Sequence, residues 1–168
     1  VDNFYKDPEA IVRSAYEQEY TEDNRFYKGK RSKGVLLPFV KEEFERILRV
    51  QITDWLSQPM NGVFQITNSE HPLVWHSDSQ SYAAAVYLTK DAGVGYGTSF
   101  WRDRTHGCRR PPNHPLEGKP HIKDSEVYTP YNLLHPDNWE LVDRVGSVYN
   151  RLVMWDAKMI HSATQYGS

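Results

Sequence analysis

The stretch WHSDSQSYAAAVYLT, residues 75–89, joins two polar side chains to an apolar segment. The segment SYAAAVYLT has the composition of a buried strand. His76 and Asp78 stand two residues apart just before it, and side-chain alternation in an extended chain puts both on one face with Val74. Both side chains can therefore reach one point. A pair of this kind is also common by chance at a strand end, as a hydrogen-bonded turn.

A third ligand is predicted from His161, which opens a strand just after the apolar run RLVMWDA. Two imidazoles and one carboxylate form the set that holds iron(II) while leaving coordination positions open, although zinc or manganese can use the same ligands. The remaining histidines stand beside Pro or Gly in predicted loops, where a solvated side chain is expected: His71, His106, His114, His121 and His135.

Two helices and then many short strands are predicted along the chain. The segment DPEAIVRSAYEQEY (7–20) has a capping Asp and Pro at the first helical position, and PFVKEEFERILRVQITDWL (38–56) carries an apolar stripe; a basic loop, YKGKRSKG, lies between them. The strands are rich in β-branched and aromatic residues. They are GVFQIT (62–67), LVWHSD (73–78), SYAAAVYLT (81–89), GTSFWRD (97–103), ELVDRVG (140–146), RLVMWDA (151–157) and HSATQY (161–166).

This order predicts a mainly β, α+β fold in one domain over 1–168, with helical support from 1–60 and a β core from 61–168. The segment between residues 102 and 139 is too long for a simple turn. It is interrupted by Pro111, Pro112, Pro115, Pro120, Pro130 and Pro136. Long irregular segments of this kind are commonly lids or binding surfaces, so we expect this one to lie where substrate approaches.

Composition narrows the function classes. The net charge of −2 lacks the basic excess of a nucleic-acid binder, and Cys108, the only cysteine, excludes an internal disulfide. No apolar run approaches a membrane span, so a cytoplasmic protein without a membrane partner is expected. Oligomeric state is left open.

The ordered motifs WHSDSQSYAAAVYLT, GYGTSFW and NRLVMWDAKMIHSA resemble the Fe(II)/2-oxoglutarate-dependent oxygenases, within their prolyl-4-hydroxylase-like branch. The matching features are His-x-Asp at 76–78, Tyr-Leu at 87–88, a turn and strand at 95–100 that is similar to Gly-Gly-x-Thr-x-Phe and matches it at Thr98 and Phe100, and an apolar strand that runs into His161. The resemblance covers roughly residues 73–166. It implies a double-stranded β-helix, or jelly roll, with the metal inside its open end.

The resemblance also implies an activity and a set of roles. His76, Asp78 and His161 would hold Fe(II), with 2-oxoglutarate and O₂ as co-substrates, ascorbate as a supporting reductant, and hydroxylation of a peptidyl or small-molecule substrate as the reaction. A retained Asp78 points to hydroxylation because halogenating relatives replace it with a small residue. Four residues are candidates for the walls of the co-substrate pocket or its hydrogen-bond donors, although Tyr and Trp in strands are more often core: Tyr82, Tyr87, Thr98 and Trp155.

One departure concerns the basic residue that members of this branch carry about ten residues after the distal histidine, where it binds the far carboxylate of 2-oxoglutarate. This sequence ends before that position, which predicts that a last strand is missing. Otherwise Arg151, Arg102 or Arg104 would serve, although each also fits a surface-paired charge. Two other classes stay open: a cupin-like metal-dependent hydrolase or isomerase, and a non-catalytic β-sandwich binding module.

Overall fold

The computed structural model describes residues 1–22 and 29–167. The chain divides into two compact units, one formed by residues 1–8 and 68–168 and the other by residues 9–67. The division therefore lies seven residues beyond the predicted limit of the helical support, and the single domain stays a prediction. In the described part of the chain the fold is mixed, with more strand than helix and three small antiparallel sheets. Within the described residues, no helix is both long and apolar enough to cross a bilayer.

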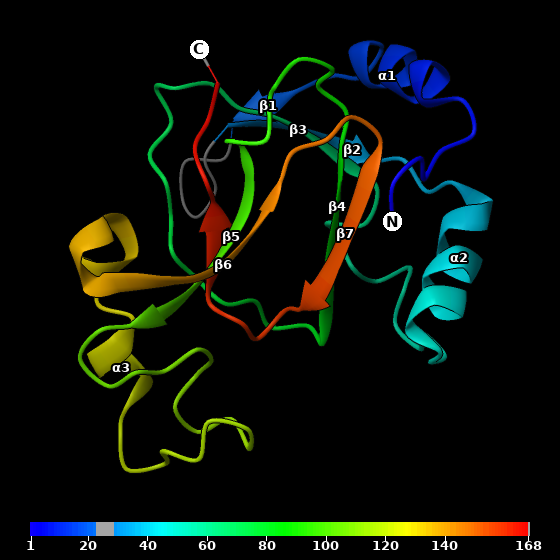
Figure 1. Cartoon of the computed structure of the whole chain (residues 1–168). Coiled ribbons are helices and arrows are strands. Elements are labelled where there is room, and N and C mark those ends of the chain that lie inside the picture. The colour runs from blue at the N-terminus through cyan, green and yellow to red at the C-terminus, as the bar shows by residue number, and fades with distance from the viewer. Residues whose placement is uncertain (23–28, 168) are drawn as a thin grey trace. The chain divides into compact units, whose positions relative to one another are not determined.

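The smaller unit holds α1 (Pro8–Tyr16), α2 (Pro38–Leu48) and a sheet of order β1-β2-β3 (Figure 1). The first residue of α1, Pro8, is assigned to the larger unit. The strands are β1 (Thr21–Glu22), β2 (Lys30–Gly34) and β3 (Val63–Ile66). The prediction of a basic loop was wrong for residues 30–34, which pair with β3; residues 27 and 28 lie outside the described residues.

Helix α2 is eight residues shorter than predicted, because the chain turns at Arg49, whose φ of 56° is left-handed. The side chain of Glu45 then accepts the backbone N–H of Ile52 at 2.8 Å, which ties the following residues back to the helix. An apolar stripe alone did not reveal this stop, since Ile52 and Trp55 continue the period. The first helix is likewise shorter than predicted and ends at Tyr16.

The larger unit contains two sheets. In the first, β4 (Tyr82–Tyr87) pairs along its whole length with β7 (Arg151–Asp156) (Figure 1). In the second, the order is β6-β5-β8, with β5 (Gly97–Asp103), β6 (Trp139–Gly146) and β8 (His161–Ala163). Most predicted strands of this unit are confirmed. The exceptions are 73–78, which contributes only an isolated bridge at His76, and 161–166, of which only three residues are strand.

Side chains connect the two sheets. Tyr87 Oη and Thr98 Oγ1 lie 2.7 Å apart, and the rings of Phe100 and Trp155 meet edge to face with centroids 5.9 Å apart. One face of β4-β7 therefore looks onto one face of β6-β5-β8, and we call these the inner faces. Gly97 allows β5 to start close to β6, because its φ is +126° and a Cβ there would lie 2.1 Å from the carbonyl oxygen of Val145.

The core lies on the opposite side of the β6-β5-β8 sheet. It consists of Trp75, Cys108, Val127, Trp139 and Ile160. Ile160 and Trp75 directly precede His161 and His76, so alternation turns the two histidines to the inner face when their neighbours are buried.

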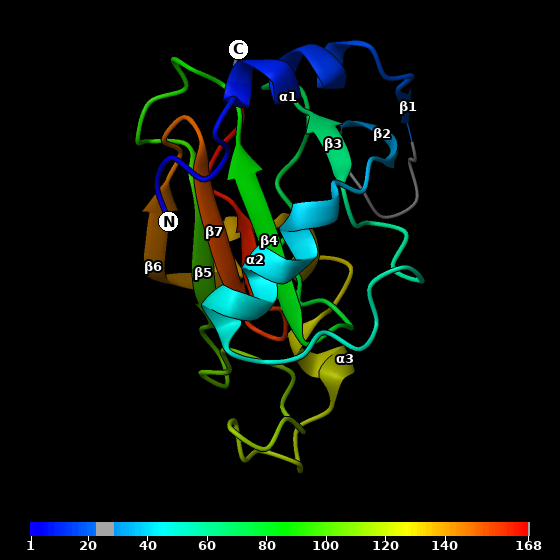
Figure 2. The ribbon, with the colours of Figure 1, turned by 90° about the vertical axis from the view of Figure 1, so that its right-hand side faces the viewer.

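Much of this core comes from the proline-containing segment. It is irregular, as predicted, apart from α3 (Asp124–Val127), η1 (Asn132–Leu134) and η2 (Pro136–Asn138). Figures 1 and 2 both show it at the end of the larger unit where β4 begins and β7 ends. Two of its carbonyl oxygens accept hydrogen bonds from the core: Leu133 O accepts from Trp75 N–H, and Arg109 O accepts from Ile160 N–H. The segment thus holds the residues that precede both histidines.

Candidate metal centre

His76 and His161 are brought together by the backbone. They form an isolated antiparallel bridge in which His76 N–H donates to His161 O at 3.1 Å and His161 N–H donates to His76 O at 2.8 Å. Asp78 N–H donates to Ala157 O at 2.8 Å, which fixes the third residue to the turn that follows β7. The two parts of the candidate site, far apart in sequence, are therefore positioned by paired main chain.

The three side chains converge. Nε2 of His76 lies 3.6 Å from Oδ1 of Asp78, Nε2 of His161 lies 3.5 Å from Oδ2 of Asp78, and potential ligand atoms of all three residues lie within 4.8 Å of one another. The imidazole centroids are 4.4 Å apart. Separations of this size are those of atoms that share one ion as ligands, each at about 2 Å from it.

Both imidazoles are oriented by main-chain carbonyls. Nδ1 of His76 lies 3.0 Å from Val74 O, and Nδ1 of His161 lies 2.8 Å from Met159 O. A carbonyl can only accept, so each Nδ1 carries the proton and each Nε2 presents its lone pair toward Asp78. This is the tautomer that a metal-binding histidine requires, with its second nitrogen held by a hydrogen bond.

Burial keeps His161 neutral. His161 is only 6% exposed, and its pKa is lowered to about 4, first by burial and then by the neighbouring imidazole of His76. A neutral imidazole can donate its lone pair to a cation, whereas a protonated one cannot. The site therefore offers two imidazole nitrogens and one carboxylate oxygen, a donor set that fits a divalent cation.

Aromatic rings form part of the wall beside the cluster. The ring of Trp155 meets the His161 imidazole at a centroid distance of 5.2 Å, and Phe100 pairs with His161 across β5 and β8. Trp155 Nε1 is buried and has no hydrogen-bond acceptor among the described residues. An unsatisfied buried N–H is costly, so an acceptor on a bound group would stabilise this position.

The other predicted pocket residues separate into two sets. Tyr87 and Thr98 share their hydrogen bond on the inner face, where Tyr87 pairs in register with Arg151. Tyr82, at the other end of the same strand, differs from Tyr87 by an odd number of residues and so lies on the outer face, 45% exposed. The structure does not bring Tyr82 to the inner face.

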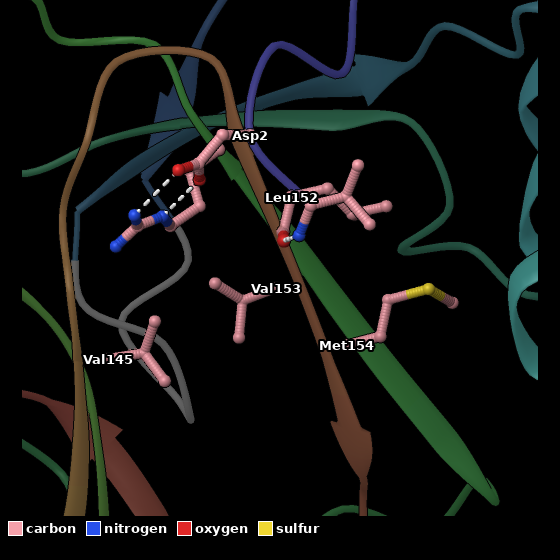
Figure 3. A pocket seen from close by; sticks show the side chains of 7 residues that line it. Asp2, Val145, Leu152, Val153 and Met154 are labelled. Carbon is pink, nitrogen blue, oxygen red and sulfur yellow. Dashed lines mark hydrogen bonds and ion pairs between the residues drawn. The ribbon is translucent and has the colours of Figure 1, made fainter.

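Arg151 lies at the start of β7 with an acidic partner. Its guanidinium binds both carboxylate oxygens of Asp2, with Nη2 2.9 Å from Oδ2, and both residues line an open surface pocket of about 550 Å³ (Figure 3). The pair lowers the pKa of Asp2 through the hydrogen bond from Arg151. Arg102, another predicted anchor, also binds a carboxylate in a bidentate manner, that of Glu140 at 2.8 and 2.9 Å.

Sequence reasoning missed three features that support the cluster. Two are the carbonyls of Val74 and Met159, which no side-chain pattern reveals, although each stands two residues before its histidine. The third is Lys158, whose ammonium donates to Asp78 O at 3.1 Å and also to Ser79 O. A lysine beside a predicted ligand was the only available signal, and by itself it does not distinguish this role from an exposed charge.

A mixed α/β protein with a preformed His-Asp-His cluster is thus the class that the fold and the site define. The chain belongs to DUF6445, a family of unknown function whose model matches residues 1–165. No curated protein and no solved structure matches it.

Proposed function

We propose that the protein is an iron(II)- and 2-oxoglutarate-dependent dioxygenase that hydroxylates a peptidyl or small-molecule substrate. The observation that carries the proposal is the convergence of His76, Asp78 and His161, with both imidazoles fixed as Nδ1–H tautomers by carbonyls. This ligand set leaves coordination positions open for further groups. We choose iron over other divalent ions because the order of the sequence motifs resembles that of the oxygenases.

A double-stranded β-helix is part of the proposal. Its support is the non-consecutive pairing of β4 with β7 and of β5 with β8, continued from β8 to residue 76 through the histidine bridge. Two facing sheets built from such non-consecutive strand pairs are typical of a jelly roll. The inner faces would then form the pocket for metal and co-substrate.

Residues on the inner faces fit a dicarboxylate. Trp155 lies beside His161, and Arg151 lies four residues back along the same strand and face, roughly 13 Å away by strand rise. The Tyr87–Thr98 hydroxyl pair lies at the level of Arg151. We infer that these hydroxyls and Arg151 bind the far carboxylate, which would replace Asp2 on the guanidinium, and that Trp155 Nε1 donates to an oxygen nearer the metal.

The chain itself would contribute positioning and the exclusion of water. When bound together, iron(II), 2-oxoglutarate and O₂ supply the oxidising chemistry. The two imidazoles and the carboxylate would fix the open side of the coordination sphere, and the rings of Phe100 and Trp155 would keep water from the reacting atoms. The proline-containing segment contacts residues next to both histidines and is the part of the chain that we expect to shape substrate access.

The decisive experiment measures metal binding and turnover separately on the full-length protein encoded by the complete gene. Cobalt(II) titration followed by visible absorption reports the site. Succinate release with iron(II), ascorbate and 2-oxoglutarate under air reports the reaction. We expect Asp78→Ala to weaken cobalt binding by at least about 100-fold and to abolish succinate release, since it removes the only anionic ligand.

Matched controls are Asp91→Ala, an exposed carboxylate in the same unit, and His121→Ala, an exposed imidazole. Both should retain wild-type cobalt affinity and turnover. Binding of cobalt without succinate release or binding of 2-oxoglutarate would reject the oxygenase and favour a metal-dependent hydrolase or isomerase. No cobalt or iron binding at all would reject the metal centre and leave the non-catalytic binding module.

A further inference from the structure

The segment that follows β5 has a charge balance unlike that of the whole chain. Residues 102–123 contain six Lys and Arg against two Asp and Glu, whereas the protein as a whole has a net charge of −2. Nearly a third of the basic residues therefore stand in this one segment, which also holds the main chain next to His161. An excess of arginine beside a binding site is a signal for anionic ligands.

One of these arginines is paired with a carboxylate, and two more stand next to that pair along the main chain. Arg102 binds Glu140 through Nε and Nη2, and the two residues pair in register between β5 and β6. The hydrogen bond from Arg102 lowers the pKa of Glu140, and the charges of Arg104 and Arg109 lower it further. The main chain brings both residues next to the pair, because Arg104 N–H donates to Asn138 O, two residues before Glu140, and Arg109 O accepts from Ile160 N–H, whose carbonyl in turn accepts from Trp101 N–H. Arg104 and Arg109 are exposed and have no ion-pair partner within residues 1–22 and 29–167.

The group is held in place by the main chain. Arg104 N–H donates to Asn138 O at 2.9 Å, next to the start of β6, and Arg109 O accepts from Ile160 N–H at 2.7 Å, next to His161. The backbones of both arginines are thus attached to the residues that directly precede β6 and β8. The charges do not belong to a free loop end, where entropy would oppose binding.

Strand alternation puts Arg102 on the same face of the sheet as His161. Trp101 points to the core side, where its Nε1 donates to Ser162 Oγ at 2.9 Å, so alternation returns Arg102 to the inner face that Phe100 shares with His161. Arg102 stands two residues beyond Phe100, which is roughly 7 Å of strand. A group bound there would lie within the length of a small molecule from the metal ligands.

We propose that Arg102, Arg104 and Arg109 form a binding site for an oxyanion, carboxylate or phosphate, carried by the substrate. This deepens the proposed function and rests on it, because the site matters for catalysis only if the metal cluster is the reaction centre. Glu140 satisfies one guanidinium in the free protein and leaves two positive charges unbalanced. The substrate oxyanion would bind to Arg104 and Arg109 and compete with Glu140 for Arg102.

The test uses the metal-free full-length protein with inorganic phosphate and with acetate as probes. Arginine Nε–Hε NMR signals report each titration. We expect the double variant Arg104→Gln/Arg109→Gln to weaken probe binding about tenfold or more, and Glu140→Gln to strengthen it about threefold, because the competing carboxylate is gone. The matched control Arg144→Gln removes one exposed arginine from the other end of β6 and should change affinity less than about twofold.

The outcomes separate the two proposals. Preference for one probe identifies the oxyanion as phosphate or carboxylate, and equal affinity supports a shared oxyanion site. Equal losses in the double variant and in Arg144→Gln, or no titration of the wild type by either probe, would overturn the oxyanion site. Cobalt titration of the same samples reports the metal centre independently, so intact cobalt binding without anion binding rejects only this inference.

Discussion

The two ends of the inner faces each hold a bidentate arginine–carboxylate pair, and the pairs differ in their surroundings. At the end near His161, Arg102 binds Glu140, and the main chain holds two further arginines next to this pair. At the far end, Arg151 binds Asp2, and both charges are balanced. The first pair is part of a positive group that can accept an external anion directly, whereas the second must release its own carboxylate before another can bind.

The largest effect expected from this difference is a split between two arginine variants. Arg151→Gln should raise the KM for 2-oxoglutarate about 10- to 100-fold, since a charge-assisted contact contributes roughly 1.5–3 kcal/mol. Arg102→Gln should leave that KM within about twofold and instead weaken phosphate or acetate binding. Succinate release as a function of 2-oxoglutarate concentration measures the first effect. Equal KM values in the two variants would remove the distinction between the ends.

A smaller effect, of opposite sign, is expected at Asp2. Asp2→Asn takes away the carboxylate that holds Arg151, so 2-oxoglutarate should bind about three- to tenfold more tightly in calorimetry. Probe binding at the Arg102 group should not change. The control Asp91→Asn removes the same charge from an exposed position of the same unit and should leave both affinities at the wild-type value. Weaker binding in Asp2→Asn would show that Asp2 supports the far end instead of competing there.

The smallest effect concerns the hydroxyl pair. Tyr87→Phe should lower the free energy of unfolding by about 1 kcal/mol at neutral pH, because the buried Thr98 hydroxyl loses its partner. Tyr82→Phe, on the exposed face of the same strand, should not change it. Urea unfolding of both variants gives the comparison, and equal stability of the two would mean that the pair contributes nothing.

The pH dependence of the same variant has a defined sign. Burial raises the pKa of Tyr87, although the hydrogen bond with Thr98 opposes this. The phenol therefore stabilises the fold below about pH 10, where a tyrosine of the unfolded chain ionises, and this contribution is lost as the pH rises through the folded pKa. Wild-type protein should lose stability above pH 10 more steeply than Tyr87→Phe. Parallel curves would contradict this assignment.

Sequence patterns predicted the larger unit better than the smaller one. In the larger unit, side-chain alternation identifies GTSFWRD as a strand, and the same rule put His76 and Asp78 on one face. Pairing along the whole of β4 and β7 stabilises two strands that the strand propensity of their residues already favours. In the smaller unit, β2 has the sequence KRSKG, which lacks β-branched and aromatic residues, and it is a strand only because β3 lies beside it.

The convergence of His161 with His76 and Asp78 was a prediction from residue type, and the structure brings the three together. The partners of the arginines could not be read from the sequence. Asp2 and Arg151 stand at opposite ends of the chain, and whether Arg102 binds a co-substrate or Glu140 depends on strand register. Register follows from packing and from the irregularity between Phe100 and Trp101, neither of which is a local property of the sequence.

The histidine bridge has a consequence for folding. It joins chain positions 76 and 161 through two hydrogen bonds only, so it is among the pairings that local opening should disrupt most easily. A cation bound by both imidazoles would act as a cross-link between the two ends of residues 77–160, and its binding free energy would add to the stability of the closed pairing. Amide hydrogen exchange at His76 and His161 should therefore slow when cobalt is added, while exchange within β4 stays unchanged. The bridge would make the completion of the sheet a metal-dependent step.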